Sequence, residues 1–355
     1  MKKNFKNILS LFTALLVGAL LLNSCEKIDS NKPDTPKPIN WTMAVVNEGW
    51  FGHEGGSINI YDKENNSWIE KAYQTANPGK QFGNTSTVGV QNGDKIYFVS
   101  KETPHLIEAE SKSMKHLSEL NLPTKGEQAM NFASVDEKRA YLTTSFGLYE
   151  ISLNPVVLGK KIAEGSCEDI FYTDGKLYYI CDKTAYCYDV SAANVNPIEI
   201  GPAKMGFVKA GAYLWAADEE NLLKIDMKAG SMEKIAAGCK LSWNEWAYTP
   251  NQLCADKDGK NIFFTSGKKI KKFNLETKTA SDLYTFTDRD FYGARMSIHP
   301  EKDILYLTTI VGWTNQTFIE LIDCNTGKQL QELPYTTAEE SNNYWFPSQV
   351  IFIQD

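Results

Sequence analysis

The sequence predicts an all-β fold, a seven-bladed β-propeller. Three observations favour this fold: a two-strand pattern recurs six times, a seventh copy is divided between the ends of the chain, and the copies are spaced like propeller blades. With 355 residues, 42% of them hydrophobic, the chain has enough apolar side chains for a core of this size.

The first 24 residues have the pattern of a signal peptide. Three lysines among the first six residues precede a largely apolar run, Ile8–Leu22, which is shorter than the roughly 20 residues that span a bilayer. The run ends in Leu22-Asn23-Ser24-Cys25, which resembles a bacterial lipobox. We therefore expect residues 1–24 to be removed and Cys25 to be lipidated, the alternative being a free cysteine beside an ordinary cleavage site.

Residues 25–40 are predicted to be a flexible tether that begins at the lipidated Cys25. This stretch is polar, contains three prolines and has almost nothing apolar to bury. An anchored chain of this kind lies outside the cytoplasm, where disulfides persist. Cys181 and Cys187 fall on neighbouring strands of one predicted hairpin, so they form either a cross-strand disulfide or two buried thiols.

The repeated pattern is a short apolar strand, a turn of Gly, Asp or Lys, and a second strand of β-branched and aromatic residues. The six copies span residues 88–100, 132–144, 170–180, 207–217, 253–265 and 296–308. Equivalent positions in successive copies are 36 to 49 residues apart, as in propeller blades. Third and fourth strands follow, such as 147–151 and 232–236, which makes four strands per blade.

The seventh copy is split between the chain ends. Residues 42–48 resemble a second strand that lacks a first, and residues 348–354 resemble a first strand that lacks a second. Joining them gives seven blades over residues 41–355, about 45 residues each, and closes the ring so that no blade edge stays open. The alternative, an array of two-sheet sandwiches, explains neither the common period nor the split copy.

The charge balance argues against a nucleic-acid partner. The chain has 44 acidic and 37 basic side chains, a net charge of −7, which becomes −10 once the three lysines of the signal peptide are removed. A nucleic-acid binder normally has a basic face.

Loops that join second to third strands, and loops that enter first strands, share one face of a propeller. Aromatic residues are concentrated there: Trp50, Phe51, His53, Phe82, Trp243, Trp246, Tyr248, Phe291, Tyr292, Trp313, Tyr344, Trp345 and Phe346. Polar residues lie among them: Asn47, Glu48, Asn84, Ser86, Gln128, Asn131, Glu168, Asn251, Arg295 and Gln349. Aromatic walls with convergent amides predict a site for an uncharged small molecule such as a corrinoid or a sugar. Some of the rings are expected to pack under their own loops instead.

Motifs for catalysis are absent from the sequence. It contains no GxSxG, HExxH, P-loop or GxGxxG pattern, so no catalytic residue, cofactor or metal site is predicted. His53 is the one histidine on the aromatic face; it is a candidate metal ligand, although a solvent-exposed loop histidine is the more common case.

The lipobox, the Pro-rich tether and the segments Val46–Asp62, Gly83–Ser86 and Ile96–Lys101 resemble the YncE-like seven-bladed propeller lipoproteins of gut Bacteroidetes. That family includes cobalamin-binding surface lipoproteins. The resemblance covers residues 41–355. It implies capture of cobalamin or a related corrinoid, as ligand and not as catalytic cofactor, under the loops Asn47–Gly55 and Lys80–Ser86 and the aromatic loops of blades five to seven.

The same resemblance implies a lipid-anchored protein of the outer membrane that faces the cell exterior and delivers its ligand to a TonB-dependent transporter. Two alternatives remain open. One is a surface glycan-binding lipoprotein, with tryptophans stacked on sugar rings, and the other is a propeller lyase or lactonase that uses channel-mouth carboxylates with a divalent ion.

Overall fold

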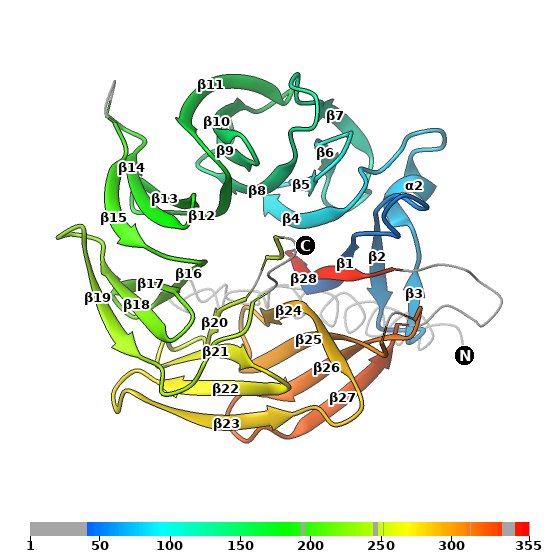
Figure 1. The fold of residues 1–355 in the computed structure, drawn as a ribbon. Helices are drawn as coiled ribbons and strands as arrows, with labels where there is room; N and C mark the ends of the chain where they lie inside the picture. Colours follow the sequence, from blue (N-terminus) through cyan, green and yellow to red (C-terminus); the bar gives the residue numbers. More distant parts are fainter. Residues whose placement is uncertain are drawn as a thin grey trace, which may run out of the picture. The chain divides into compact units, whose positions relative to one another are not determined.

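The computed structural model describes residues 41–192, 196–243, 248–250, 252–312, 314–335 and 345–354. These residues form seven four-stranded antiparallel sheets arranged as the blades of a propeller (Figure 1). The predicted fold class is therefore confirmed. The predicted signal peptide and tether lie outside the described residues.

Each blade is built from an inner strand at the channel to an outer strand at the rim. Blade one contains β28 (Pro347–Gln354), β1 (Trp41–Asn47), β2 (Ser57–Asp62) and β3 (Ser67–Ile69), followed by the short helix α2 (Ala72–Ala76). Blade two contains β4 (Ser86–Asn92), β5 (Lys95–Ser100), β6 (Leu106–Glu110) and β7 (His116–Leu120). Blade three contains β8 (Ala129–Ser134), β9 (Arg139–Thr144), β10 (Gly147–Ser152) and β11 (Val157–Glu164).

The remaining four blades repeat this arrangement. Blade four contains β12 (Cys167–Thr173), β13 (Lys176–Cys181), β14 (Thr184–Asp189) and β15 (Ile198–Pro202). Blade five contains β16 (Met205–Ala210), β17 (Tyr213–Ala217), β18 (Asn221–Asp226) and β19 (Ser231–Ala236). Blade six contains β20 (Cys254–Ala255), β21 (Asn261–Ser266), β22 (Lys269–Asn274) and β23 (Thr279–Thr285), and blade seven contains β24 (Asp290–Ile298), β25 (Ile304–Ile310), β26 (Thr317–Asp323) and β27 (Gln329–Pro334).

The burial pattern explains why the second strand of each repeat is a continuous apolar run. In β5 every residue from Ile96 to Ser100 is buried, because neighbouring blades cover both faces of the sheet. The outer strand β7 alternates between half-buried and exposed positions instead. One apolar cluster joins Val46 and Ile58 of blade one to Phe98 and Ile107 of blade two, so blade-to-blade packing forms the core.

Strands β1 and β28 close the ring as predicted. They pair antiparallel from Trp41 opposite Gln354 to Asn47 opposite Pro347. Inner strands contact one another in the cyclic order β28, β4, β8, β12, β16, β20, β24 and back to β28. The two ends of the chain thus build one blade, which Figure 1 shows as a red strand beside a blue one.

The disulfide pairing differs from the bridge considered between Cys181 and Cys187. Cys181 is bonded to Cys167, which lies directly opposite it across β12 and β13. A two-residue turn at residues 182–183 places Cys181 opposite Thr184, whereas Cys187 is opposite Tyr178 and keeps a free thiol. The register of the hairpin therefore keeps Cys181 and Cys187 apart.

Candidate binding site

Among the described residues of the predicted face, the loop between β1 and β2 carries the most exposed aromatic group. Trp50 and Phe51 are 38% and 69% exposed, and the ring of His53 is stacked on Trp50 with centroids 3.9 Å apart. The amides of His53 and Glu54 both donate to the carbonyl of Trp50 at 2.8 Å, which forms a tight turn. We call Trp50, Phe51 and His53 the aromatic tip.

The base of this loop is fixed, so that its tip is held out from the protein. Gly49 has φ +75°, and a side chain there would meet the backbone of residues 54 and 55. Glu54 is paired with Lys71 at 2.6 Å, and the backbone of Glu48 and Gly49 donates to the carbonyls of Phe346 and Trp345. Large apolar rings that are exposed on a fixed loop are typical of a contact surface.

Several predicted site residues are buried inside the blades. Phe82 packs against Tyr73 and Phe98, Ser86 bonds to Ser100, and Asn47 bonds to Ser57 and Tyr335. Trp345 and Phe346 are also buried, and Phe291 is half-buried against Phe286. These side chains hold the loops in place. Residue type alone does not tell whether such a side chain packs inside the protein or contacts a ligand.

Other predicted residues are half-buried at the loop face. The side chain of Asn84 donates to Glu102 at 3.1 Å, and the backbone N–H of Gln128 donates to the hydroxyl of Ser145. The ammonium groups of Lys204 and Lys240 lie 4.9 and 5.7 Å from the ring centroid of Trp243. Predicted residues outside the described part of the chain are Trp246, Asn251, Trp313 and Tyr344, together with the side chain of Tyr292.

A short segment, Tyr248–Pro250, crosses the channel beneath the loop face. The Tyr248 hydroxyl donates to Asp169 of blade four at 3.0 Å and accepts from Asn131 of blade three at 2.6 Å. Its carbonyl accepts from Lys101 of blade two at 3.1 Å. Figure 1 shows the connection between β19 and β20 reaching the centre of the ring. We call this segment the central plug.

Further contacts connect the central plug and the residues beside it to blades one and seven. Thr249 donates to the carbonyl of Gly293 at 2.8 Å. Arg295, which is 1% exposed, forms an ion pair with Glu48 and donates to the carbonyl of Pro347 at 2.8 Å. Sequence reasoning placed Tyr248, Asn131, Glu48 and Arg295 around a ligand, whereas the structure brings them into contacts with one another and with neighbouring blades.

Burial sets the electrostatics of the plug. Burial raises the pKa of Asp169 from 3.8 to about 7, although the hydrogen bond from the Gly206 amide opposes the shift. Burial likewise raises the pKa of Glu168 and that of Tyr248, and it lowers the pKa of Lys101. The pKa of Asp169, which accepts a hydrogen bond from the plug residue Tyr248, therefore lies near neutrality.

Asp169 should make the stability of the protein fall as pH rises. Its folded pKa exceeds its unfolded value, so its contribution is complete below about pH 4 and is lost progressively up to about pH 7, at most about 4 kcal/mol. We expect urea midpoints of Asp169→Asn to lack this decline. Parallel pH profiles for the variant and the wild type would contradict the assignment.

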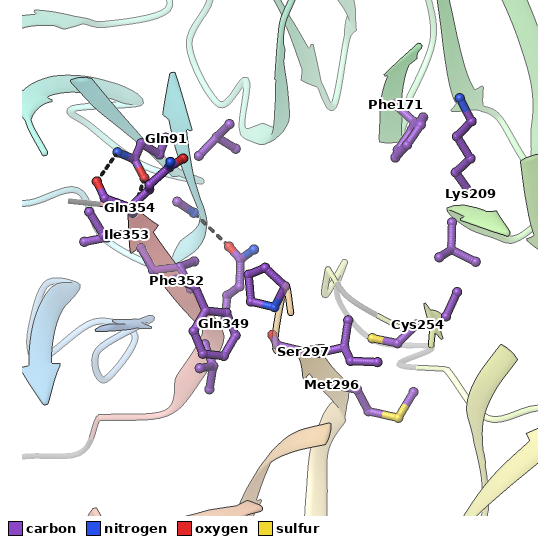
Figure 2. Close-up of a pocket in the computed structure, with 18 of the residues that line it drawn as sticks. Gln91, Phe171, Lys209, Cys254, Met296, Ser297, Gln349, Phe352, Ile353 and Gln354 are labelled. Atoms are coloured by element: carbon purple, nitrogen blue, oxygen red, sulfur yellow. Dashed lines mark hydrogen bonds between the residues drawn. The ribbon is translucent and has the colours of Figure 1, made fainter. Parts of the chain in front are cut away.

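The lower part of the channel, away from the loop face, holds a cavity of about 740 Å³ (Figure 2). Gln349 is the one predicted site residue that lines it. Most of the other lining residues come from inner strands, away from the loop face, and sequence reasoning did not single them out. The sequence carries little indication of this cavity, because its lining residues are mostly the apolar residues expected in any inner strand.

The histidines of the blades take structural roles. His105 contacts the carbonyl of Glu127 at 3.1 Å, and His116 contacts the hydroxyl of Tyr73 at 2.9 Å. Within the described ranges, no three His, Cys, Asp or Glu side chains are placed to hold a metal ion. No helix in the same ranges is long and apolar enough to cross a membrane.

Comparisons with known proteins agree on the fold. A family model described as "Domain of unknown function (DUF5074)" matches residues 42–353. A solved quinonprotein alcohol dehydrogenase-like protein from Bacteroides thetaiotaomicron VPI-5482 is 17% identical over 88% of this chain and 77% of its own, with a TM-score of 0.69. A protein from Lactobacillus plantarum is 14% identical over 88% and 99% of the two chains, with a TM-score of 0.62.

A third solved structure is similar over a smaller part of this chain. It is the extracellular domain of a one component system from Bacteroides thetaiotaomicron, 10% identical over 74% of this chain and 35% of its own, with a TM-score of 0.54. At these identities the likeness shows the fold alone. No curated protein matches the sequence.

Proposed function

We propose that this chain, which belongs to the family described as "Domain of unknown function (DUF5074)", is a binding protein that captures a corrinoid on its loop face. The observation that carries the proposal is the aromatic tip. Phe51 is the most exposed large hydrophobic side chain in the described part of the molecule, and Trp50 stands beside it. Exposed aromatic rings on a rigid support bind flat ligands at little entropic cost.

The ligand lies across this face and not deep in the channel. The central plug crosses the channel below the loops, and the hydroxyl and carbonyl of Tyr248 are already bonded to side chains of three blades. A large ring system with peripheral amides suits such a surface, because it stacks on Trp50 and His53 and reaches half-buried polar groups such as Asn84.

The proposed role is capture without chemistry on the ligand. Asp169, whose pKa of about 7 would suit a proton-transfer group, is enclosed by Tyr248 and the Gly206 amide. With the lipobox at Cys25, the chain would hold the ligand at the outer membrane, face the cell exterior and pass the ligand to a TonB-dependent transporter.

Isothermal titration of the chain from Glu26 onward with cyanocobalamin, and separately with cobinamide, tests the proposal. We expect one-to-one binding, and we expect Trp50→Ala to weaken it by about 2 kcal/mol, roughly thirtyfold, as central aromatic anchors do. Ile198→Ala is the matched control, because Ile198 is 62% exposed on the outer strand β15 and should leave affinity unchanged. Absence of heat with both corrinoids would reject the corrinoid and favour the glycan alternative.

A further inference from the structure

The cavity in the lower channel opens on the face opposite the aromatic tip. It is lined by the far halves of β4, β24 and β28 and by parts of β12, β16 and β20. The plug-level residues Asn131, Asp169 and Arg295 come earlier on the inner strands β8, β12 and β24, so they lie toward the loop face. At about 740 Å³, the cavity is in the size range of sites that hold small molecules, roughly 300–1,000 Å³.

The two charged side chains of the lining already have partners within the protein. Lys209 is paired with Asp174 at 3.2 Å. Asp256 accepts from the amides of Lys260 and Asn261 and from the side chain of Asn261. An ion that entered the cavity would lose its hydration, and it could pair with either side chain only by displacing these partners, so the cavity favours an uncharged ligand.

The lining offers hydrogen bonds of both kinds. Gln349 accepts from the amide of Gly89 at 2.8 Å through Oε1, and its Nε2 is left on the cavity side (Figure 2). Each inner strand pairs with a second strand along one edge, so the backbone of the other edge faces the channel. A ligand with several hydroxyl or amide groups finds both donors and acceptors here.

Two aromatic rings supply apolar faces at this level. Phe352 is held by contacts to His299 and Tyr306, with ring centroids 4.9 and 5.0 Å apart, and it stays half-buried. Phe171 is half-buried on another side of the open space (Figure 2). A sugar ring combines an apolar C–H face with a hydroxyl edge, which matches rings and amides placed around one cavity.

We propose that this cavity is a second binding site, which takes an uncharged carbohydrate of one or two rings. The site is separate from the corrinoid surface, because the central plug lies between them. In it the sugar stacks on Phe352 and accepts a hydrogen bond from Nε2 of Gln349.

Titration calorimetry with cellobiose, maltose and diacetylchitobiose, each up to about 10 mM, tests the site on the chain from Glu26 onward; this range detects millimolar affinity. We expect binding of at least one of the three probes. We expect Gln349→Glu to weaken it at least about tenfold, since glutamate keeps the acceptor for Gly89 but removes the donor and adds a charge.

Phe352→Leu is the second variant, and it decides the question if Gln349→Glu fails to fold. It should also weaken sugar binding at least about tenfold, because it removes the stacking ring. Phe51→Ala is the matched control and should leave sugar binding unchanged while it weakens corrinoid binding. If no probe binds, or if the folded cavity variants bind sugar with unchanged affinity, the proposed sugar site is wrong. The corrinoid proposal is unaffected by either result.

Discussion

Deletion of residues 348–355 is expected to abolish the cooperative unfolding transition of the protein. The deletion removes most of β28 and leaves the inner edge of β1 unpaired. Val350, Ile351 and Ile353 are buried, and burial of a side chain of this size contributes about 1.5–3 kcal/mol, roughly 5–9 kcal/mol for the three. A whole domain has a net stability of only about 5–15 kcal/mol. Urea titration followed by circular dichroism measures the loss.

A permuted chain provides the control for this deletion. Gln354 lies opposite Trp41, so residues 347–354 placed ahead of Trp41 through a short turn form a hairpin with β1. This chain should unfold cooperatively, because it keeps the strand and changes only its connection. A deletion variant with a native-like transition would show that β28 is dispensable for the ring.

Arg295→Met is expected to lower the free energy of unfolding by about 3–5 kcal/mol, the range found when one partner of a buried ion pair is removed. Arg295 is almost fully buried, and it connects Glu48, which directly follows β1, to the carbonyl of Pro347 at the start of β28. The substitution leaves the buried Glu48 carboxylate without its guanidinium partner. Urea denaturation at pH 7 with a fixed m-value measures the change.

Two further variants separate the ion pair from simple loss of volume. Lys209→Met removes an exposed ion pair with Asp174 and should cost about 0–1 kcal/mol. Glu48→Gln combined with Arg295→Met should cost less than the two single losses added, because the double variant leaves neither a carboxylate without its guanidinium nor a guanidinium without its carboxylate. Additive losses would mean that the two side chains stabilise the ring independently.

The propeller could be predicted because its repeats are local in sequence. Each copy carries its own turn, as in Asn92-Gly93-Asp94 between β4 and β5, and its own apolar second strand. The long-range pairing of β1 with β28 was also accessible, since each strand lacked a partner and the two were complementary. The disulfide partner of Cys181 was harder to predict, because it depends on the strand register, which is set by where the turn begins.

The site was less accessible to prediction, for a physical reason. The sequence shows that aromatic residues gather on the loops, but not whether a ring faces solvent, as Phe51 does, or packs inside, as Trp345 does. The plug depends on bonds from Tyr248 to Lys101, Asn131 and Asp169, which belong to three other blades. No local pattern encodes such contacts, because they exist only once the ring has formed.

The closure of the ring also has a mechanical consequence. Strand β1 lies between β28 and β2, and it begins at Trp41, where the chain enters the propeller. When Trp41 is pulled along the direction of β1, the hydrogen bonds on both sides of the strand run perpendicular to the pull. Those bonds are loaded together in shear, whereas an outer strand pulled sideways would peel off one bond at a time. A force applied to this end is therefore distributed over the hydrogen bonds of a blade that contains both ends of the propeller chain.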